Sequence, residues 1–461
     1  MFPATRFATW CIVAIAALLS TEVTCAESKQ LALVGGMLLD GTGGAPVHHA
    51  AILIEGNRIL AAGPATDVRI PAGTPVIDTS GATMLPGLIE LHAHLLLVGH
   101  GDIGNWFAWL EKHEAEYSAE TVMALSARQL LSAGITSAVD LGAPLRESVS
   151  VRDRINRGEI PGPRLSVSGP WLIPNAAIFP RKYQRIVSTP EEAARATEAN
   201  IRGGADVIKA QGGLTLAQYQ AIVATAHKFH IKVHAHLYEE QAVRDAFDAG
   251  VDVLQHAGSA GTAPYDPALV RAIADSGRPV VPTAAHRVWV LPATREFPER
   301  LDDPELKRQF PADMWAELQN SFRDFSNLDY FKNHSREESY GDDSIRQWIL
   351  SGAVIGMGSD NGSPLNFHTD ALWREAKVFV DHGLPAARTI AALTSVGARI
   401  LGKEKDLGTI GPGKLADITV VRGNPLFDIT SLSSVAVVVK DGIAYRNAQP
   451  VNLRALPRAN R

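Results

Sequence analysis

The stretch Leu88-Ile89-Glu90-Leu91-His92-Ala93-His94 indicates the fold class of this chain. It begins as an apolar run of the kind that forms a buried strand, and it ends in two imidazole side chains. Because alternate residues of a strand point to the same side, His92 and His94 can share one cation. A pair of histidines at this spacing is a weak signal by itself, so its meaning depends on the residues that end the other strands.

Strand-like apolar runs alternate with helix-like segments rich in Ala, Glu, Arg and Leu through the middle of the chain. This alternation is typical of a parallel sheet with crossover helices. Eight strands separated by helices over about 300 residues predict an α/β fold, a (β/α)8 TIM barrel, whose chemistry lies where the strands end. The eight runs are Met84–Leu91, Thr136–Leu141, Arg164–Ser168, Asp206–Ala210, Lys232–His236, Val253–His256, Pro279–Thr283 and Val354–Ser359.

Both ends of the chain are rich in short strand-like runs separated by glycines. The expected strands are Leu31–Leu39, Ala51–Glu55, Arg58–Ala62, Ala416–Val421 and Val435–Lys440. Two β-rich ends around a different middle predict one composite β-sandwich domain. The predicted domains are a sandwich from residues 27–85 and 406–461, and a metal-binding barrel from residues 86–405.

The connection after the seventh barrel strand, residues 286–347, is long for a single loop. Its aromatic residues include Trp289, Trp315, Phe322, Phe325, Tyr330 and Phe331. We expect a helical insertion over the active-site face. A lid that shapes the pocket and an ordinary packed excursion are equally expected from this pattern.

Residues 1–26 have the order of a cleavable export signal: a charge at Arg6, an apolar run from Trp10 to Leu19, and small residues at Thr24 and Ala26. The apolar run is too short to span a bilayer comfortably. Cleavage after Ala26 predicts a periplasmic or secreted protein with no stable membrane insertion. A retained membrane anchor is the alternative.

The composition narrows the classes of partner and ligand. The chain has 461 residues, 46% of them hydrophobic, a formal net charge of −5 and a pI near 6.3, so it lacks the basic field that nucleic-acid binding requires. Both cysteines, Cys11 and Cys25, lie within the predicted signal. A mature chain would then have no cysteine, and its metal ligands would be His, carboxylate or Lys-derived groups.

Further ligand-type residues stand at the ends of the other barrel runs. His234 closes the fifth run, His256 closes the sixth, and Asp360 follows the eighth. Since the carboxyl ends of parallel strands meet at one mouth, these side chains would lie near His92 and His94. A carboxylate there can coordinate a metal and can also take a proton from an attacking water.

Lys209 ends the fourth run in Val207-Ile208-Lys209-Ala210, where a cation beside metal ions would be unfavourable. Carboxylation of its amine by CO2 gives a carbamate, an oxygen ligand that can bridge two metals. A lysine that binds a substrate carboxylate, or one that extends its charge to solvent, is an equally weighted alternative.

These motifs together resemble the amidohydrolase superfamily, and the resemblance covers nearly all of the mature chain. It rests on Pro86–His94, on the run Leu407-Gly408-Thr409-Ile410-Gly411-Pro412-Gly413-Lys414-Leu415-Ala416-Asp417, and on Gly423-Asn424-Pro425-Leu426. The ligand set is similar to the binuclear branch with a carboxylated lysine, which includes Xaa-dipeptidases, ochratoxinase-like amidases and imidazolonepropionase-related proteins.

The resemblance implies two divalent metal ions. His92, His94 and Asp360 would hold the more buried ion, His234 and His256 the other, and carboxylated Lys209 would bridge them. Zinc is the default ion for a set of His and oxygen ligands, with manganese and cobalt as alternatives.

One choice inside the site stays open, because His234-Ala235-His236 offers two imidazoles on one strand face. Motif position favours His234 as the ligand and leaves His236 to line the pocket. Tyr238 and His286 are further candidates for substrate binding, and each has an alternative role in packing.

The predicted function is metal-dependent hydrolysis of C–N bonds in an amide, peptide or lactam, including a dipeptidase or N-acyl amino acid amidase. A hydroxide held between the metals would attack the carbonyl carbon, with Asp360 as general base and then general acid. An ester or phosphotriester hydrolase and a non-catalytic binding protein of the same fold are the alternatives. The expected partner is a small-molecule substrate, and the sequence leaves a homo-oligomer open.

Overall fold

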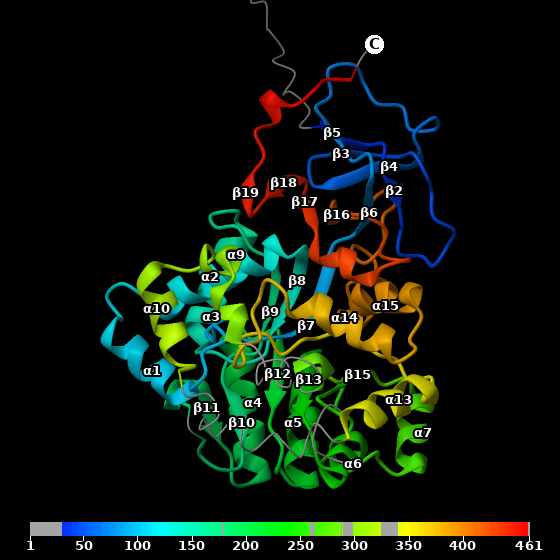
Figure 1. Ribbon diagram of the computed structural model, residues 1–461. Helices are drawn as coiled ribbons and strands as arrows, with labels where there is room; N and C mark the ends of the chain where they lie inside the picture. The colour runs from blue at the N-terminus through cyan, green and yellow to red at the C-terminus, as the bar shows by residue number, and fades with distance from the viewer. Residues whose placement is uncertain are drawn as a thin grey trace, which may run out of the picture.

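The computed structural model describes residues 30–177, 179–258, 263–286, 288, 298–323 and 340–459. The chain forms a β-sandwich and a barrel, and strands from both ends of the chain make up the sandwich (Figure 1). The predicted export signal, residues 1–26, lies outside the described residues. No helix in the part of the chain that the structure describes is long and apolar enough to cross a membrane.

The sandwich consists of two sheets. The first has the order β4-β3-β1-β5 and is formed by β1 (Gln30–Val34), β3 (Ala50–Glu55), β4 (Arg58–Pro64) and β5 (Val76–Asp78). The second has the order β19-β18-β17-β16-β6-β2 and joins both chain ends through β2 (Met37–Leu38), β6 (Ala82–Pro86), β16 (Ile418–Arg422), β17 (Val435–Lys440), β18 (Ile443–Arg446) and β19 (Gln449–Pro450). The prediction of a composite sandwich is confirmed, because β6 pairs with β16 across the sequence.

The sandwich packs one apolar core between its sheets. Leu33 and Ile52 from the first sheet contact Met84, Ile418 and Val439 from the second, and all five are buried. Alternation along each strand places these residues on the inner face. The apolar residues from both ends of the chain therefore form one core between the two sheets.

The barrel strands run parallel in two hydrogen-bonded groups. One group is β7 (Leu88–Ala93), β8 (Ile135–Asp140) and β9 (Arg164–Val167). The other has the order β11-β10-β12-β13-β14-β15, formed by β10 (Trp171–Ile173), β11 (Gln184–Ile186), β12 (Val207–Ala210), β13 (Lys232–His236), β14 (Val253–Gln255) and β15 (Val280–Val281). The (β/α)8 prediction is confirmed, with β10 and β11 as an additional pair beside β12.

Backbone hydrogen bonds close the ring between these groups. Asp206 N donates to Val167 O at 2.8 Å, which joins β12 to β9. On the other side, Gly356 N donates to Val280 O at 2.9 Å, and Leu91 N donates to Met357 O at 3.0 Å. The eighth predicted run, Val354–Ser359, therefore lies between β15 and β7, although its pairing is too irregular to form a regular strand.

The first predicted run, Met84–Leu91, is wrong in one respect, because it is two strands. β6 ends at Pro86 and belongs to the sandwich, whereas β7 begins at Leu88 and belongs to the barrel. Between them, Gly87 lies so close to β8 that an added Cβ would be 2.0 Å from the Thr136 hydroxyl oxygen. A continuous apolar run hides this change of sheet, since both strands are buried.

Helices surround the barrel (Figure 1). They are α1 (Ile103–Lys112), α2 (Ala119–Ser132), α3 (Leu145–Asn156), α4 (Pro190–Arg202), α5 (Leu216–Lys228), α6 (Glu240–Ala249), α7 (Pro267–Ser276), α13 (Gly341–Ser351), α14 (Ala371–Asp381), α15 (Ala386–Leu393) and α16 (Ser395–Leu401). Short 3-10 turns are η1 (Arg181–Tyr183), η3 (Pro298–Asp302), η5 (Ile429–Ser433) and η6 (Leu453–Ala455). Side chains such as Thr189 and Thr215 cap the helix starts by accepting backbone N–H bonds.

The described part of the predicted insertion packs beside α1 and α2. It forms α9 (Pro304–Lys307) and α10 (Ala312–Asn320), and Tyr117 at the start of α2 donates its hydroxyl to Asp313. Trp315 and Phe322 are buried in the main core. These contacts agree with the expectation that the segment with α9 and α10 packs against the barrel helices. Its other predicted aromatic residues, Trp289, Phe325, Tyr330 and Phe331, lie outside the described residues.

Candidate metal centre

Three ligand-type side chains meet at the carboxyl end of β7. His94 Nε2 lies 3.1 Å from Asp360 Oδ1, and His92 Nε2 lies 3.6 Å from the same oxygen. One ligand atom from each residue falls within 4.8 Å of the others, and all three residues are buried. The structure thus brings together the part of the predicted ligand set that comes from the first and eighth barrel strands.

A buried carboxylate, Glu90, holds this cluster in place. It accepts hydrogen bonds from the backbone N–H of His92 and of Ser359 at 2.8 and 2.9 Å, and from the side chains of Ser359 and Asn361. Burial raises the pKa of Glu90 to about 7, although the hydrogen bonds oppose that rise. Glu90 was missed from the sequence, where a charged residue inside an apolar strand was the available signal.

Three residues at the ends of neighbouring strands have left-handed backbone conformations. His256, Thr283 and Asp360 have φ values of 63°, 55° and 57°. Such conformations cost free energy for residues other than glycine, about 1–3 kcal/mol each, and they cluster at functional sites. In this protein, these conformations change the direction of the backbone directly after the strands, at the barrel mouth.

Lys209 and His256 lie beside the cluster. Lys209 Nζ is 3.3 Å from His92 Nε2, and the rings of His92 and His256 are 4.4 Å apart between centroids. His256 Nδ1 pairs with the Thr283 hydroxyl at 2.7 Å, which leaves Nε2 as the remaining ring nitrogen. Burial lowers the pKa of Lys209 to about 7, so the amine is available in its neutral form near neutral pH.

The charge states of the cluster suit metal binding. Burial lowers the pKa of His92 and of His256 well below the usual range, so both rings are neutral. For Asp360, burial acts to raise the pKa, but the hydrogen bond with His94 and the nearby histidines lower it well below its usual range. Neutral imidazoles and an ionised carboxylate are the forms that coordinate a metal.

Of the two imidazoles on β13, His236 lies at the barrel mouth. Its ring is 4.3 Å from that of His256 between centroids, and it lines the same cavity as Lys209 and Asp360. His234 instead pairs with the Gln255 side chain and lines a different cavity. Two residues along a strand advance about 6.6 Å, so only the later histidine reaches the mouth. We therefore replace His234 with His236 as the candidate ligand from the fifth strand.

At the end of β7, by contrast, both His92 and His94, which directly follows the strand, reach the cluster. The register between β7 and β8 shifts between Glu90 and Ala93. This irregularity shortens the advance along the strand and lets His92 and His94 approach one oxygen of Asp360. The same two-residue spacing therefore has different consequences in the two strands.

The two remaining predicted residues have different surroundings. Tyr238 lines the cavity, with its ring 4.6 Å from that of His236 between centroids. His286 is not among the described residues that line the cavity, and its Nε2 donates to the carbonyl of Pro364 at 3.0 Å. Substrate binding by His286 stays a prediction, and this hydrogen bond joins its ring to the 363–366 turn, whose Ser363 lines the cavity.

The cavity at the barrel mouth has a volume of about 440 Å³. Its metal end consists of His94, Lys209, His236, His256 and Asp360. The apolar wall of the cavity is formed by Leu97, Ile103, Trp171, Ile173, Pro174, Ala177 and Phe179. Among the described lining residues, Lys209 is the only lysine or arginine. A substrate held here would place a polar bond at the metal end and an apolar group on the wall.

Trp171 of this wall depends on a glycine. Its indole Nε1 donates to Leu141 O, and its ring contacts that of His94 edge to face at 5.9 Å. Gly142 has φ 151°, and a Cβ added there would be 2.0 Å from Trp171 Nε1.

Gly142→Ala is therefore expected to destabilise the protein by about 1–3 kcal/mol beyond backbone strain alone. Gly63→Ala is the matched control, because Gly63 has nearly the same φ of 154° but open space at its Cβ position. The difference in the free energy of unfolding between the two variants, measured by denaturant titration, isolates the clash. Equal values for the two variants would contradict it.

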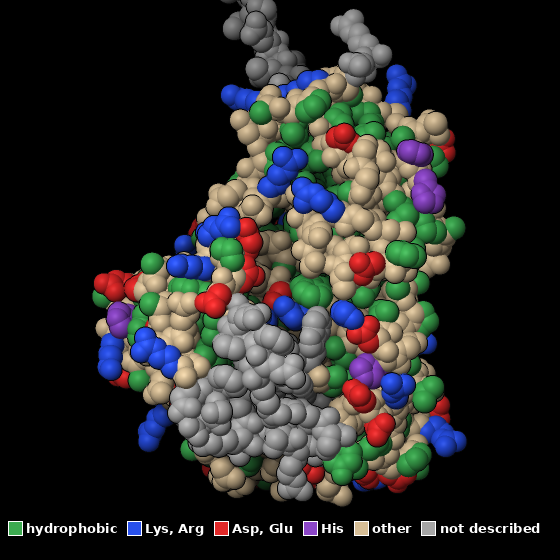
Figure 2. Space-filling view, in the orientation of Figure 1, with side chains coloured by type: hydrophobic (Ala, Val, Ile, Leu, Met, Phe, Trp, Pro, Cys, Tyr) green, Lys and Arg blue, Asp and Glu red, His purple; other side chains and the backbone are tan. Residues whose placement is uncertain are grey.

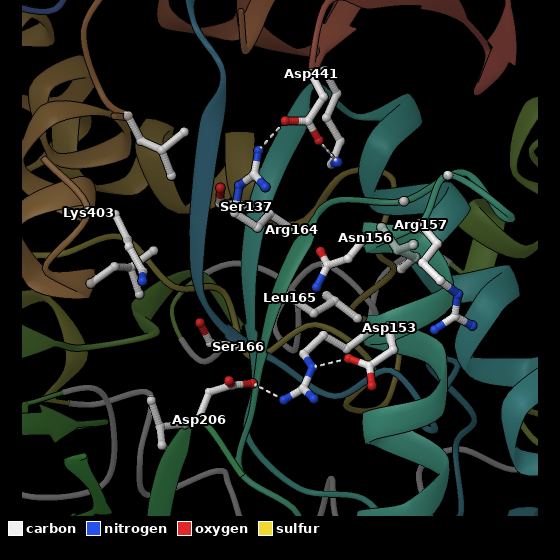
Figure 3. A pocket seen from close by; sticks show the side chains of 18 of the residues that line it. Ser137, Asp153, Asn156, Arg157, Arg164, Leu165, Ser166, Asp206, Lys403 and Asp441 are labelled. Atoms are coloured by element: carbon white, nitrogen blue, oxygen red, sulfur yellow. Dashed lines mark hydrogen bonds and ion pairs between the residues drawn. The ribbon is translucent and has the colours of Figure 1, made fainter. Parts of the chain in front are cut away.

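A second and larger cavity, of about 930 Å³, lies at the amino-terminal ends of the barrel strands, against the sandwich (Figure 3). Arg164 from β9 reaches Asp441 from the sandwich at 2.5 Å, and Arg152 pairs with Asp153 and with Asp206 at 2.8 Å. His234 also lines this cavity. On the outer surface, acidic and basic side chains are interspersed over the face shown in Figure 2.

Comparison with known proteins agrees with this geometry. The model of the amidohydrolase family matches residues 83–444. A 5-methylthioadenosine/S-adenosylhomocysteine deaminase from Symbiobacterium thermophilum is 28% identical in an alignment of 433 positions that covers 85% of this chain and 85% of the deaminase.

Solved structures give the same result for the fold. A putative prolidase from Bifidobacterium longum is 26% identical with a TM-score of 0.70, over 92% of this chain and 94% of its own. The ochratoxinase of A. niger is 23% identical with a TM-score of 0.68, over 91% and 96%, and that likeness concerns the fold alone.

Proposed function

The chain belongs to the amidohydrolase family and is a hydrolase of carbon–nitrogen bonds, and from that premise we propose that it hydrolyses uncharged amides that carry an apolar or aromatic group. One observation carries the proposal. The cavity joins a buried set of metal-ligand side chains to an apolar wall. A hydrolase pocket of this kind fixes the reacting bond with polar groups and holds the remainder of the substrate by burial.

The side chains fit two divalent ions. His92, His94 and Asp360 would hold one ion, His236 and His256 the other, and Lys209 would lie between them. The fit rests on the neutral histidines, the ionised carboxylate and the burial of the cluster. Such ions, with zinc as the default for this donor set, lower the pKa of a water and polarise a carbonyl oxygen.

Lys209 would carry a carbamate in the active protein. Its neutral amine attacks CO2, a C–N bond forms, and the nitrogen releases one proton to solvent, which converts a buried amine into an anionic oxygen donor. This change removes the positive charge that would otherwise lie 3.3 Å from His92 Nε2. The buried position and the lowered pKa of Lys209 support the reaction.

Asp360 would transfer the proton during hydrolysis. Its Oδ1 lies within 3.6 Å of both His92 and His94, at the metal end of the cavity. There the carboxylate can accept a proton from the attacking water and return it to the leaving nitrogen. Tyr238, which lines the same cavity, would donate a hydrogen bond to the carbonyl oxygen as charge develops there.

Deamination of an aminopurine nucleoside is the second candidate. It is favoured by the curated relative from Symbiobacterium thermophilum, which aligns with 85% of this chain. Both reactions hydrolyse a C–N bond, but deamination releases ammonia whereas amide hydrolysis releases an amine and a carboxylate. The aromatic wall formed by Trp171 and Phe179 could also stack on a purine ring.

The proposal predicts bound metal and a defined product. Metal analysis of the purified protein is expected to give two ions per chain. Hydrolysis is expected for N-acyl anilides and N-acylated aromatic amino acid amides, and weaker hydrolysis for charged dipeptides. Ammonia released from 5′-deoxyadenosine without amide cleavage would replace the proposal with the second candidate. A metal-free protein that is inactive after zinc, manganese or cobalt addition would overturn both.

Phe179→Ala is expected to lower kcat/KM for an aryl amide by about tenfold, because it removes part of the apolar wall. The same variant should change kcat/KM for a small alkyl amide little, since that substrate does not reach the wall. Phe427→Ala is the control, because that side chain is 91% exposed on the surface. An equal loss for both substrates would contradict the assignment of the wall to substrate binding.

We also propose that the protein is exported, on the basis of residues 1–26 alone. The expected result of N-terminal sequencing of protein from the cell envelope or medium is a mature chain that begins at Glu27. Recovery of a chain that retains Arg6 from the soluble cytoplasmic fraction would contradict export.

A further inference from the structure

The side chain of Gln255 connects His92, a candidate metal ligand, with His234 on the neighbouring strand β13. Its Oε1 lies 2.8 Å from His92 Nδ1, and its Nε2 lies 2.9 Å from His234 Nδ1 and 3.2 Å from the backbone oxygen of Leu91. Gln255 is completely buried. Each of its polar atoms is therefore engaged inside the barrel, where an unpaired group would be costly.

The Leu91 carbonyl fixes the orientation of this amide. A carbonyl oxygen only accepts, so the atom of Gln255 that faces Leu91 must be its nitrogen. The opposite orientation would bring two oxygens together at 3.2 Å. The amide nitrogen has two hydrogens, and these serve Leu91 O and His234 Nδ1.

The orientation of Gln255 determines which ring nitrogens carry protons. His92 must donate from Nδ1 to Gln255 Oε1, which leaves the lone pair of His92 Nε2 to accept from Lys209 Nζ at 3.3 Å or to coordinate a metal. His234 must accept at Nδ1, so its own proton is on Nε2. The cavity that His234 lines is at the amino-terminal ends of the barrel strands, where water can accept from that N–H.

We propose that His234 is a positioning residue of the metal site: it holds Gln255, which in turn holds the ring of His92 in the tautomer that coordinates a metal. His234 itself binds no metal. The inference rests on the proposed metal site, although the hydrogen-bond chain exists without it. Partners of this kind orient the ligand, and their loss weakens metal binding about 10- to 100-fold.

A set of variants separates a positioning residue from a ligand. His234→Leu removes the acceptor for Gln255, whereas the amide oxygen of His234→Asn can replace Nδ1 but no longer has a ring Nε2. We expect His234→Leu to keep two metals per chain at saturating zinc and to weaken zinc affinity about tenfold or more in competition with a chelator. His234→Asn should recover most of that affinity. His236→Asn should instead retain one metal per chain.

A double variant tests whether His234 acts through Gln255. If it does, Gln255→Leu combined with His234→Leu should lose no more zinc affinity than Gln255→Leu alone. Losses that add would overturn the proposal. Loss of one metal per chain in both His234→Leu and His234→Asn would also overturn it, because that result identifies a ligand.

The metal-free protein provides a readout that does not depend on the proposed function. Nitrogen-15 spectra of histidine-labelled protein should show His92 protonated at Nδ1 and His234 protonated at Nε2, with assignments from His92→Asn and His234→Asn. The reverse tautomer of either ring overturns the inference. If the tautomers are as expected but the wild-type protein binds no zinc, manganese or cobalt, the proposed function fails and the hydrogen-bond chain stands.

Discussion

Asp360→Asn is expected to lower kcat for amide hydrolysis about 100- to 10,000-fold while the protein keeps its metals at saturating concentration. The amide is nearly the same size as the carboxylate and keeps an oxygen near His92 and His94, which lie 3.6 and 3.1 Å from Oδ1. An amide does not accept a proton from water at neutral pH. The substitution therefore removes proton transfer more than it removes coordination.

The measurement is kcat together with metal content for the same preparation. Asp381→Asn is the control, because that exposed aspartate pairs with Lys377 on α14 away from the cavity. It should have wild-type activity. Near-normal turnover by metal-loaded Asp360→Asn would remove Asp360 from its role in proton transfer.

Lys209→Ala is expected to lower activity at least about a hundredfold and to reduce the metal content, because it removes the donor proposed to lie between two ions. Lys209 is one of the largest fully buried side chains, so the substitution also leaves space beside His92. A short carboxylic acid such as acetate or propionate fits that space and supplies the missing oxygens. Its addition should restore part of the activity.

Lys232→Ala is the matched control for this rescue. Lys232 lies on β13 and lines the cavity at the opposite end of the barrel. Short carboxylic acids should not change its activity. Growth with carbon-13 bicarbonate should also give a carbamate signal in the wild-type protein that is absent from Lys209→Ala. Full metal occupancy and activity in Lys209→Ala, or the same carbamate signal in that variant, would remove the bridging role.

The succession of elements could be predicted from the sequence because it depends on local patterns. Apolar runs such as Thr136–Leu141 and Lys232–His236 correspond to β8 and β13 within one residue. Periodicity could not show that Met84–Leu91 changes from one sheet to another at Gly87. That change depends on pairing with β16 and β8, which are remote in the sequence.

Some residues of the candidate site could likewise be predicted from the sequence, and others could not. A histidine or carboxylate at the end of a strand is a local feature, and it was sufficient to single out His92, His94 and Asp360, which form a buried cluster. Glu90 and Gln255 were missed, because their roles consist of hydrogen bonds to Ser359, Asn361, His92 and His234 on other strands. A residue type alone does not reveal such partners.

The sequence by itself determined the order of strands and helices, and it determined which residue types stand at the strand ends. Only the tertiary structure decided which of those side chains meet. His92 and His94 reach one oxygen of Asp360 because the register of β7 shifts, whereas regular β13 separates His236 at the mouth from His234, which lines the cavity at the amino-terminal ends of the strands. The physical reason is that a spacing of two residues fixes the side of a strand but not the distance travelled along it, which depends on pairing with neighbouring strands.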